Sequence, residues 1–93
     1  MLEKNVEKKL TTEAKKRGGL AVKFVSPGLN GVPDRLVLFP GGRLAFVELK
    51  APGEKPRKLQ IHRAEQLKAL GFRVYTVDTV EQIGGVLDEI QSA

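Results

Sequence analysis

The sequence has no cysteine, a single histidine and no long apolar stretch. Without cysteine, the chain forms neither a disulfide nor a thiolate metal site. His62 has no second histidine with which to bind a metal, so we expect it on the surface. No segment is apolar enough for long enough to span a membrane, and the first residues are too charged for a signal peptide. We therefore expect a cytoplasmic protein.

The charged residues that are present favour a polyanionic partner. The chain of 93 residues has 16 lysines and arginines against 11 acids, which gives a net charge of +5. Its composition, 41% hydrophobic and 29% charged, is typical of a globular protein. The length supports one domain with one core, over residues 1–93. For so small a domain, a pI of about 9.8 suggests nucleic acid as the partner.

Two apolar runs in the middle of the chain, residues 36–39 and 44–49, flank Pro40-Gly41-Gly42 and predict a β-hairpin. If Phe39 pairs with Arg43, then Asp34 lies directly opposite Glu48. Side chains alternate along a strand, so Lys50 shares this face. Both strands are also apolar on both faces, which predicts a sheet that is covered on both sides.

The charged trio of Asp34, Glu48 and Lys50 would lie at one end of this buried sheet, where charge is costly without a function. Two carboxylates whose facing Cβ atoms are roughly 5 Å apart repel each other unless a cation lies between them, and Mg²⁺ or Mn²⁺ favours such an oxygen-rich site. A lysine beside them can orient or deprotonate an attacking water, or stabilise developing phosphorane charge. The alternative is an ordinary solvated pair, worth under about 1 kcal/mol.

The pairing of Pro33-Asp34 with Glu48-Leu49-Lys50 resembles the PD-(D/E)XK nuclease motif. The longer set of strings FVSPG, GVPDR, FVELKAPG and LQ, in that order, is similar to the VRR-NUC family of that superfamily. The resemblance extends over nearly the whole chain and is to the stand-alone, phage-type minimal domain. It implies a metal-dependent endonuclease that cuts DNA phosphodiesters as a homodimer, on branched DNA such as four-way (Holliday) junctions in repair or recombination.

The resemblance also implies roles for individual residues. The metal ligands would be Asp34, Glu48, the backbone carbonyl of Leu49, and a glutamate of the first helix. Glu7 is the better match for that glutamate, and Glu3 is a possible substitute. Lys50 would act on the attacking water, and Gln60 would support the site. Apart from the resemblance, the basic loop that follows Lys50 predicts a place where phosphate docks, and a solvated linker is the alternative. The residues expected to contact DNA are Lys55, Arg57, Lys58 and Arg35.

Hydrophobic periodicity predicts the remaining elements. We expect a first helix over residues 2–17 with an apolar stripe of Leu2, Val6, Leu10 and Ala14, and a second helix over 57–70. A third follows a capping-box sequence that starts at Thr79. Strands are predicted over residues 20–25, 32–39, 43–50 and 72–77. The order α-β-β-β-α-β-α, with a right-handed β-α-β crossover, predicts a mixed α/β fold of the PD-(D/E)XK type, in which helices cover both faces of a four-stranded sheet.

Two other functions remain as alternatives to a nuclease. One is a non-catalytic nucleic-acid-binding module on a nuclease scaffold, and the other is a plain interaction domain whose charges are structural. Every expected catalytic position is filled, which argues against the first. The clustering of Asp34, Glu48 and Lys50 argues against the second. Dependence of activity on a metal would separate the nuclease from both.

Overall fold

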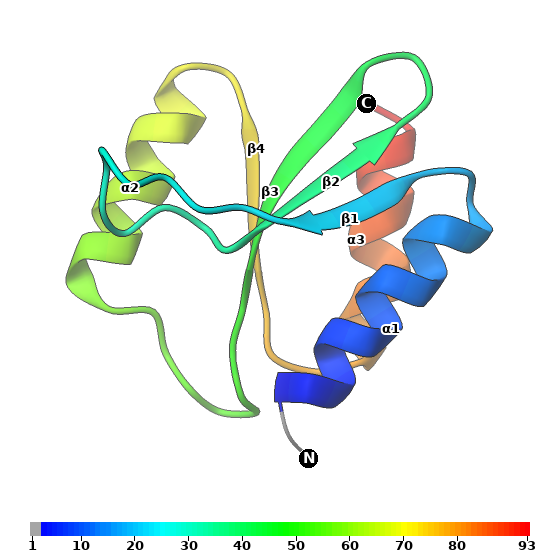
Figure 1. Ribbon diagram of the computed structural model, residues 1–93, viewed down its shortest axis with the longest axis horizontal. Coiled ribbons are helices and arrows are strands. Elements are labelled where there is room, and N and C mark those ends of the chain that lie inside the picture. Colours follow the sequence, from blue (N-terminus) through cyan, green and yellow to red (C-terminus); the bar gives the residue numbers. More distant parts are fainter. Residues whose placement is uncertain (1–2) are drawn as a thin grey trace.

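The structure is a computed structural model that describes residues 3–93, with side chains from Lys4 onward. Within this range the elements are α1 (Glu3–Lys16), β1 (Leu20–Lys23), β2 (Arg35–Phe39), β3 (Arg43–Leu49), α2 (Lys58–Ala69), β4 (Arg73–Val77) and α3 (Glu81–Gln91) (Figure 1). The predicted order α-β-β-β-α-β-α is confirmed. Leu2, predicted to begin the first helix, lies outside the described residues.

The four strands form one sheet in the spatial order β1-β2-β3-β4. β1, β2 and β3 are antiparallel neighbours, and β4 is parallel to β3, with α2 making the crossover between them. The register of the hairpin pairs Phe39 with Arg43, as predicted. The mixed sheet therefore has the predicted topology.

One face of the sheet is sealed by α1 and α3, which pack on each other and lie to the right of the strands in Figure 1, with α2 on the left. From α1, the predicted stripe residues Val6, Leu10 and Ala14 are all buried. The strands and α3 complete this core with Val37, Phe39, Ala45, Val47, Leu49, Val77, Ile83, Leu87 and Ile90. The core is continuous because every second residue of β2 and β3 points into it.

The other face of the sheet carries α2, which packs on β4 and has no buried residue. An aromatic row lies on this face, where the Phe46 ring is 5.7 Å from that of Phe24 and 5.8 Å from that of Phe72, both edge to face. Helices therefore lie on both faces, as predicted, but they bury the two faces to different extents. Among residues 3–93, no helix combines the length and apolar character needed to cross a membrane.

Several element boundaries differ from the sequence prediction, most of them by one residue, and β1 ends at Lys23 and not at residue 25. β2 begins at Arg35 and not at residue 32, because Pro33 has no N–H to donate to a strand ladder. α3 begins after Val80, and no side chain caps it as the capping-box sequence had suggested. Only half of that motif forms: the Gln82 side-chain oxygen accepts the Thr79 N–H at 3.1 Å. His62 is exposed, as predicted.

Candidate active site

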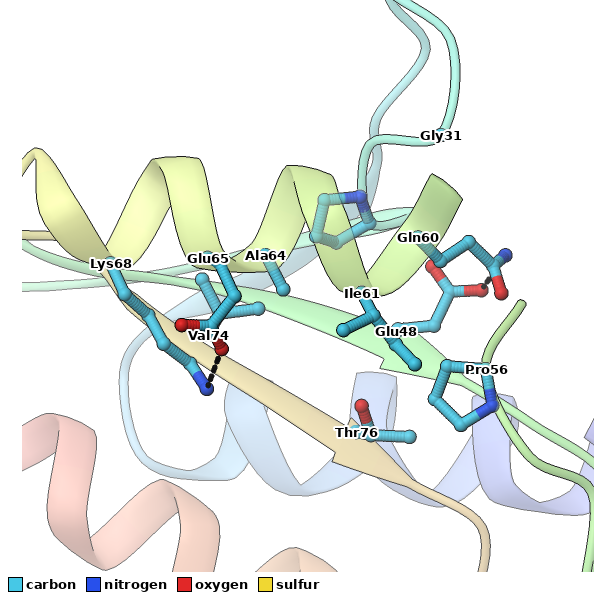
Figure 2. A pocket seen from close by; sticks show the side chains of 11 residues that line it. Gly31, Glu48, Pro56, Gln60, Ile61, Ala64, Glu65, Lys68, Val74 and Thr76 are labelled. Atoms are coloured by element: carbon cyan, nitrogen blue, oxygen red, sulfur yellow. Dashed lines mark hydrogen bonds and ion pairs between the residues drawn. The ribbon is translucent and has the colours of Figure 1, made fainter. Parts of the chain in front are cut away.

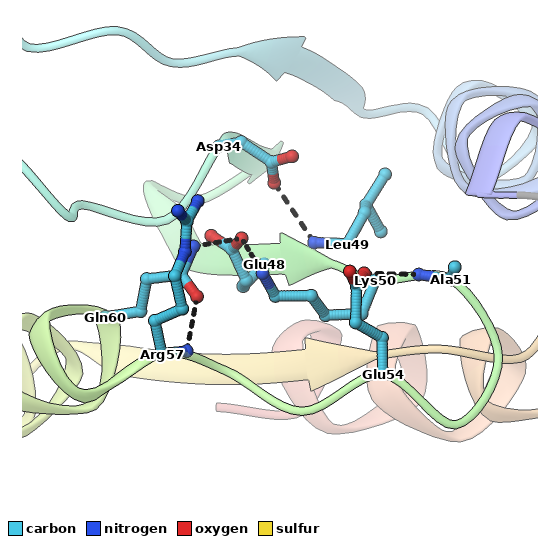
Figure 3. Close-up of polar contacts among 8 residues, drawn as sticks. All are labelled: Asp34, Glu48, Leu49, Lys50, Ala51, Glu54, Arg57 and Gln60. Carbon is cyan, nitrogen blue, oxygen red and sulfur yellow. Dashed lines mark hydrogen bonds and ion pairs between the residues drawn. The ribbon is translucent and has the colours of Figure 1, made fainter.

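The site begins where the hairpin opens at its free end. The β2–β3 ladder runs as far as the pair of Arg35 and Val47, so Asp34 and Glu48 lie just beyond it. Asp34 is held from one side by its own backbone, whose carbonyl accepts the Phe24 N–H at 2.8 Å. On the other side, its carboxylate oxygen Oδ1 accepts the Leu49 N–H at 3.1 Å. Asp34 therefore reaches across to the end of β3 (Figure 3).

Glu48 and Lys50 occupy the end of β3 and are almost fully buried, with 8% and 7% of their surfaces exposed. Lys50 Nζ lies 3.4 Å from Glu48 Oε2 and forms an ion pair with it. The Gln60 side chain donates to the same oxygen, with 3.0 Å between Gln60 Nε2 and Glu48 Oε2 (Figure 3). The predicted grouping of Glu48, Lys50 and Gln60 is therefore present.

The environment of Glu48 disfavours its ionised form. Burial raises the pKa of Glu48 above its ordinary value, and the neighbouring Asp34 charge raises this pKa further. Lys50 acts in the opposite direction through its positive charge and hydrogen bond, without cancelling the rise. A buried carboxylate that is destabilised by a second carboxylate is stabilised when a cation binds to both.

Gln60 connects the site to the start of α2. Its side-chain oxygen Oε1 accepts the Arg57 N–H at 2.8 Å, while its amide nitrogen donates to Glu48. The position of the first turn of α2 is therefore coupled to that of the Glu48 carboxylate. Sequence reasoning placed Gln60 near Glu48 but did not foresee this second bond.

The loop between β3 and α2, residues 50–57, crosses from the site to α2. Side-chain carboxylates accept two backbone N–H groups in its first half: Ala51 N–H donates to Glu54 Oε1 at 3.2 Å, and Gly53 N–H donates to Asp78 Oδ2 at 3.2 Å. The backbone carbonyls of Val77 and Ala51 accept the N–H groups of Lys50 and Glu54, both at 2.9 Å. The basic residues expected to contact DNA from here, Lys55, Arg57 and Lys58, are all exposed. They form no ion pair with the side chains of residues 4–93, which leaves their charge available to a ligand.

Glu7 and Arg35 meet on the opposite face of the sheet from Glu48. The Arg35 side chain is buried against α1 and forms an ion pair with the Glu7 carboxylate. Arg35 was expected to contact DNA, but its position in β2 turns it inward, toward the core face. Together with Lys4 and Leu49, the pair lines a surface hollow of about 360 Å³. Leu49 thus lies between this hollow and Asp34.

Comparison with known proteins identifies the family. Models of known protein families gave no match. Over 77 residues, the chain is 53% identical to a protein named "Putative nuclease p44" from Acyrthosiphon pisum secondary endosymbiont phage 1, and the match covers 83% of each chain. A solved structure described as a VRR_NUC domain is 31% identical, with a TM-score of 0.86, over 92% of this chain and 94% of the other. The chain belongs to the VRR-NUC family.

The oxygen donors of this VRR-NUC chain fit a hard divalent ion. Within residues 3–93, no group of three or more histidine, cysteine, aspartate or glutamate side chains is arranged to hold a metal. Asp34 and Glu48 alone provide carboxylates at one place. That is the usual protein contribution to a magnesium site, where water and substrate phosphate complete the coordination. The raised pKa of Glu48 agrees with a site built for a cation.

A cavity beside Glu48 in the VRR-NUC chain was not foreseen from the sequence. It has a volume of about 130 Å³ and lies between α2 and the sheet, where Ala64 faces Val74 (Figure 2). At its far end, Lys68 and Glu65 form an ion pair at 3.7 Å. The only sequence signal for it is the small side chain of Ala64 on the sheet-facing side of α2. The cavity shows how loosely α2 covers the site.

Proposed function

We propose that this chain is a metal-dependent endonuclease that hydrolyses phosphodiester bonds in DNA, and that residues 1–93 act as one nuclease domain. The observation that supports this most directly is the joining of Asp34 to the end of β3, where Glu48, Lys50 and Gln60 share hydrogen bonds. Such a buried charged cluster lowers stability unless a ligand offsets it. Because the related p44 protein comes from a phage, we also propose that the enzyme acts in the cytoplasm of a bacterial host.

In this proposal Asp34 and Glu48 hold Mg²⁺ or Mn²⁺, with the Leu49 backbone carbonyl as a further ligand. Glu7, which the sequence predicted as another ligand, is paired with Arg35 on the other face and would have to leave that ion pair to assist from α1. When bound, such an ion polarises the phosphate and lowers the pKa of water. Gln60 fixes the Glu48 carboxylate through its 3.0 Å hydrogen bond, so that the oxygen facing the metal keeps one orientation. Glu3, the alternative to Glu7, has no described side chain.

Lys50 acts on the reacting groups and not on the metal. Its ammonium carries no lone pair while protonated, so it cannot be a ligand. It is buried beside Glu48, where water is largely excluded and its positive charge is little screened. From there it orients the attacking water and stabilises the negative charge that develops on the phosphate.

Substrate binding in this proposal uses the exposed cations of the loop and α2 start: Lys55, Arg57 and Lys58. They lie in the chain between Lys50 and Gln60, so a duplex at the site would bring phosphates next to them. Arg35 is left out of this set, since it is buried against Glu7. Replacing the three exposed cations by alanine should lower the log–log salt slope of binding by up to about 3 per subunit.

A homodimer that acts on branched DNA is the finer part of the proposal. On the α2 side of the sheet, Leu20, Leu38 and Leu44 are paired across three strands in one row. Leu20 and the nearby Val22 are 55% and 37% exposed. Exposed apolar patches are typical of self-associating surfaces. A second copy on this surface would give two sites, as paired cuts in a junction require.

The test of the function is incubation of the protein with labelled linear, flapped and four-way DNA, with Mg²⁺, with Mn²⁺ or with a chelator. We expect cleavage only with a metal, and faster on the branched substrates. Asp34→Asn serves as the inactive control. Metal-independent DNA binding without any cleavage would instead favour the non-catalytic binding module.

The test of the dimer is sedimentation of the wild type and of Leu20→Lys, which places a charge in the middle of the apolar row. We expect a dimer for the wild type and a monomer for the variant. Val25→Lys is the matched control, because Val25 is 78% exposed but lies outside the row. A monomeric wild type that cuts linear and branched DNA equally would overturn the junction-resolving part and leave the metal site untouched.

A further inference from the structure

The lysines of α1 fall into two groups according to their partners. Lys9 and Lys16 share one acid, with distances of 3.5 and 3.4 Å from their Nζ atoms to Glu13 Oε2. The other group, which we name the outer stripe, consists of Lys4, Lys8 and Lys15. Its members are exposed and form no ion pair with the described side chains, those of residues 4–93. Their positive charge is therefore available to a ligand, while that of the first group is partly neutralised.

The spacing of the outer stripe puts its lysines on one side of α1. Positions four and seven residues apart lie on the same side of an α-helix, which applies to Lys4, Lys8 and Lys15. The buried side of the same helix is marked by Val6 and Leu10, so the stripe points away from the core. At 1.5 Å per residue, the stripe is roughly 16 Å long.

The outer stripe starts next to the proposed active site. Lys4 lines the surface hollow together with Glu7 and Leu49. The Leu49 N–H in turn donates to Asp34. Leu49 therefore contacts both the hollow and one of the two carboxylates that are proposed to bind the metal. Figure 1 shows the N-terminal end of α1 near the loop that follows β3, and the helix running away from there.

We propose that the outer stripe binds the DNA backbone beyond the scissile phosphate, so that one arm of the substrate lies along α1. This inference rests on the proposed nuclease function. A length of roughly 16 Å corresponds to about five base-pair steps of 3.4 Å. The stripe would thus contact a stretch of backbone distinct from the phosphates that lie near Lys55, Arg57 and Lys58. The substrate would then be held on both sides of the cut.

The two lysine groups provide a matched test. Lys8→Gln/Lys15→Gln and Lys9→Gln/Lys16→Gln each remove two positive charges from exposed positions on the same helix. Binding to a fluorescein-labelled duplex of about 30 base pairs is followed by anisotropy over a range of NaCl concentrations, without metal. Each lost phosphate contact lowers the log–log salt slope by roughly 0.9, so we expect a drop of about 2 for the stripe variant and under about 0.5 for the other. Equal drops, or no drop for the stripe variant, would overturn the proposal.

A second measurement tests the placement of the arm. Once the cut position is mapped, duplexes are shortened to end at the cut from one side or from the other. The stripe variant should bind more weakly than the wild type to one of these duplexes and equally to the other. A similar deficit on both would show that the stripe does not follow one arm. Because the salt titration needs no metal and no cleavage, failure of the nuclease function and failure of the stripe are distinguished.

Discussion

On the face of the sheet toward α1 and α3, the covering helices bury six side chains completely or almost so: Val6, Leu10, Ala14, Ile83, Leu87 and Ile90. On the face toward α2, the covering helix buries none, and a cavity of about 130 Å³ remains beneath it. The charged residues Glu48 and Lys50 lie on this second face. The comparison indicates that the first face provides most of the stability of the fold. The second face holds buried charges, which in the proposed function are stabilised when a ligand binds.

The loose covering of the second face has a physical reason. Under the proposed function, a helix that packed tightly over Glu48 would exclude the metal and the phosphate, which have to reach the carboxylates from outside. α2 instead touches Glu48 through one polar side chain, Gln60. The fold tolerates weak packing of α2, because the core residues lie between the sheet, α1 and α3 and none of them comes from α2. Substitutions on the two faces should therefore have opposite consequences for activity and stability.

The largest effect should follow removal of a carboxylate charge on the site face. We expect Asp34→Asn and Glu48→Gln to reduce cleavage by about 10³-fold or more, because two carboxylates are needed for the ion. Asp34→Asn keeps an oxygen acceptor for the Leu49 N–H and removes a charge that repels Glu48. Its melting temperature without metal should therefore equal or exceed that of the wild type. Single-turnover cleavage and thermal melting in a chelator measure the two quantities. A stability loss with full activity would show a structural role.

The opposite behaviour is expected on the core face. Leu87→Ala should lower the free energy of unfolding by about 2–5 kcal/mol, because it leaves a cavity in a fully buried site. Its turnover per folded molecule should stay near that of the wild type. Urea unfolding measures the loss, with Ile61→Ala on α2 as the control. Ile61 is 50% exposed, so its truncation should change stability by under about 1 kcal/mol. A similar loss for both variants would remove the distinction between the faces.

A smaller effect is expected at Gln60, the residue of α2 that contacts Glu48 of the sheet. Gln60→Ala should reduce metal affinity or activity by about 10- to 100-fold, as is common for residues that orient a metal ligand. Gln66→Ala, on the same helix, is the control, since the side-chain oxygen of Gln66 accepts from Arg63 at 2.8 Å on the exposed side. Manganese titration by calorimetry, together with turnover, reports the change. Equal values for both variants would rule out the orienting role.

The smallest effect concerns the pH dependence of stability without metal. The pKa of Glu48 is raised in the folded protein, so the folded state holds this proton at a pH where the unfolded chain has released it. The pKa of Glu48 is about 4.5 in the unfolded chain and higher in the folded protein. As the pH rises from the first of these pKa values through the second, Glu48 stabilises the fold less. The stability of Glu48→Gln relative to the wild type should increase over that window and then level off. Urea unfolding in a chelator from about pH 4 to about pH 7.5 measures the difference. A difference that falls with pH would contradict the raised pKa.

The sequence predicted the elements and the hairpin register because these depend on local patterns. Alternating apolar residues and the turn at Gly41-Gly42 decide which side chains share a face, and Phe39 pairs with Arg43 as that pattern requires. The nearness of Glu48, Lys50 and Gln60 follows from the same periodicity. These features could be read before any tertiary contact was known.

The parts that could not be predicted depend on how elements pack in three dimensions. Nothing local indicates that Glu7 meets Arg35, because the two residues are far apart in the chain and the contact depends on how α1 lies on β2. The exposure of the apolar row through Leu20 depends on which strands α2 leaves uncovered. The cavity depends on the height of α2 above Val74. Each of these is a property of packing distance, for which the hydrophobic pattern carries no signal.

The distribution of the site and the core along the chain has a consequence for folding. Asp34 and Leu49 are 15 residues apart, whereas Arg17 of α1 donates to Asp88 of α3, 71 residues away, at 2.7 Å. Closing the longer loop costs roughly 1.4 kcal/mol more in chain entropy. The hairpin that bears the carboxylates therefore closes at the lower entropic cost, and the docking of α1 on α3 closes the longer loop. The two carboxylates of the site thus lie in the part of the chain that has the shorter loop to close.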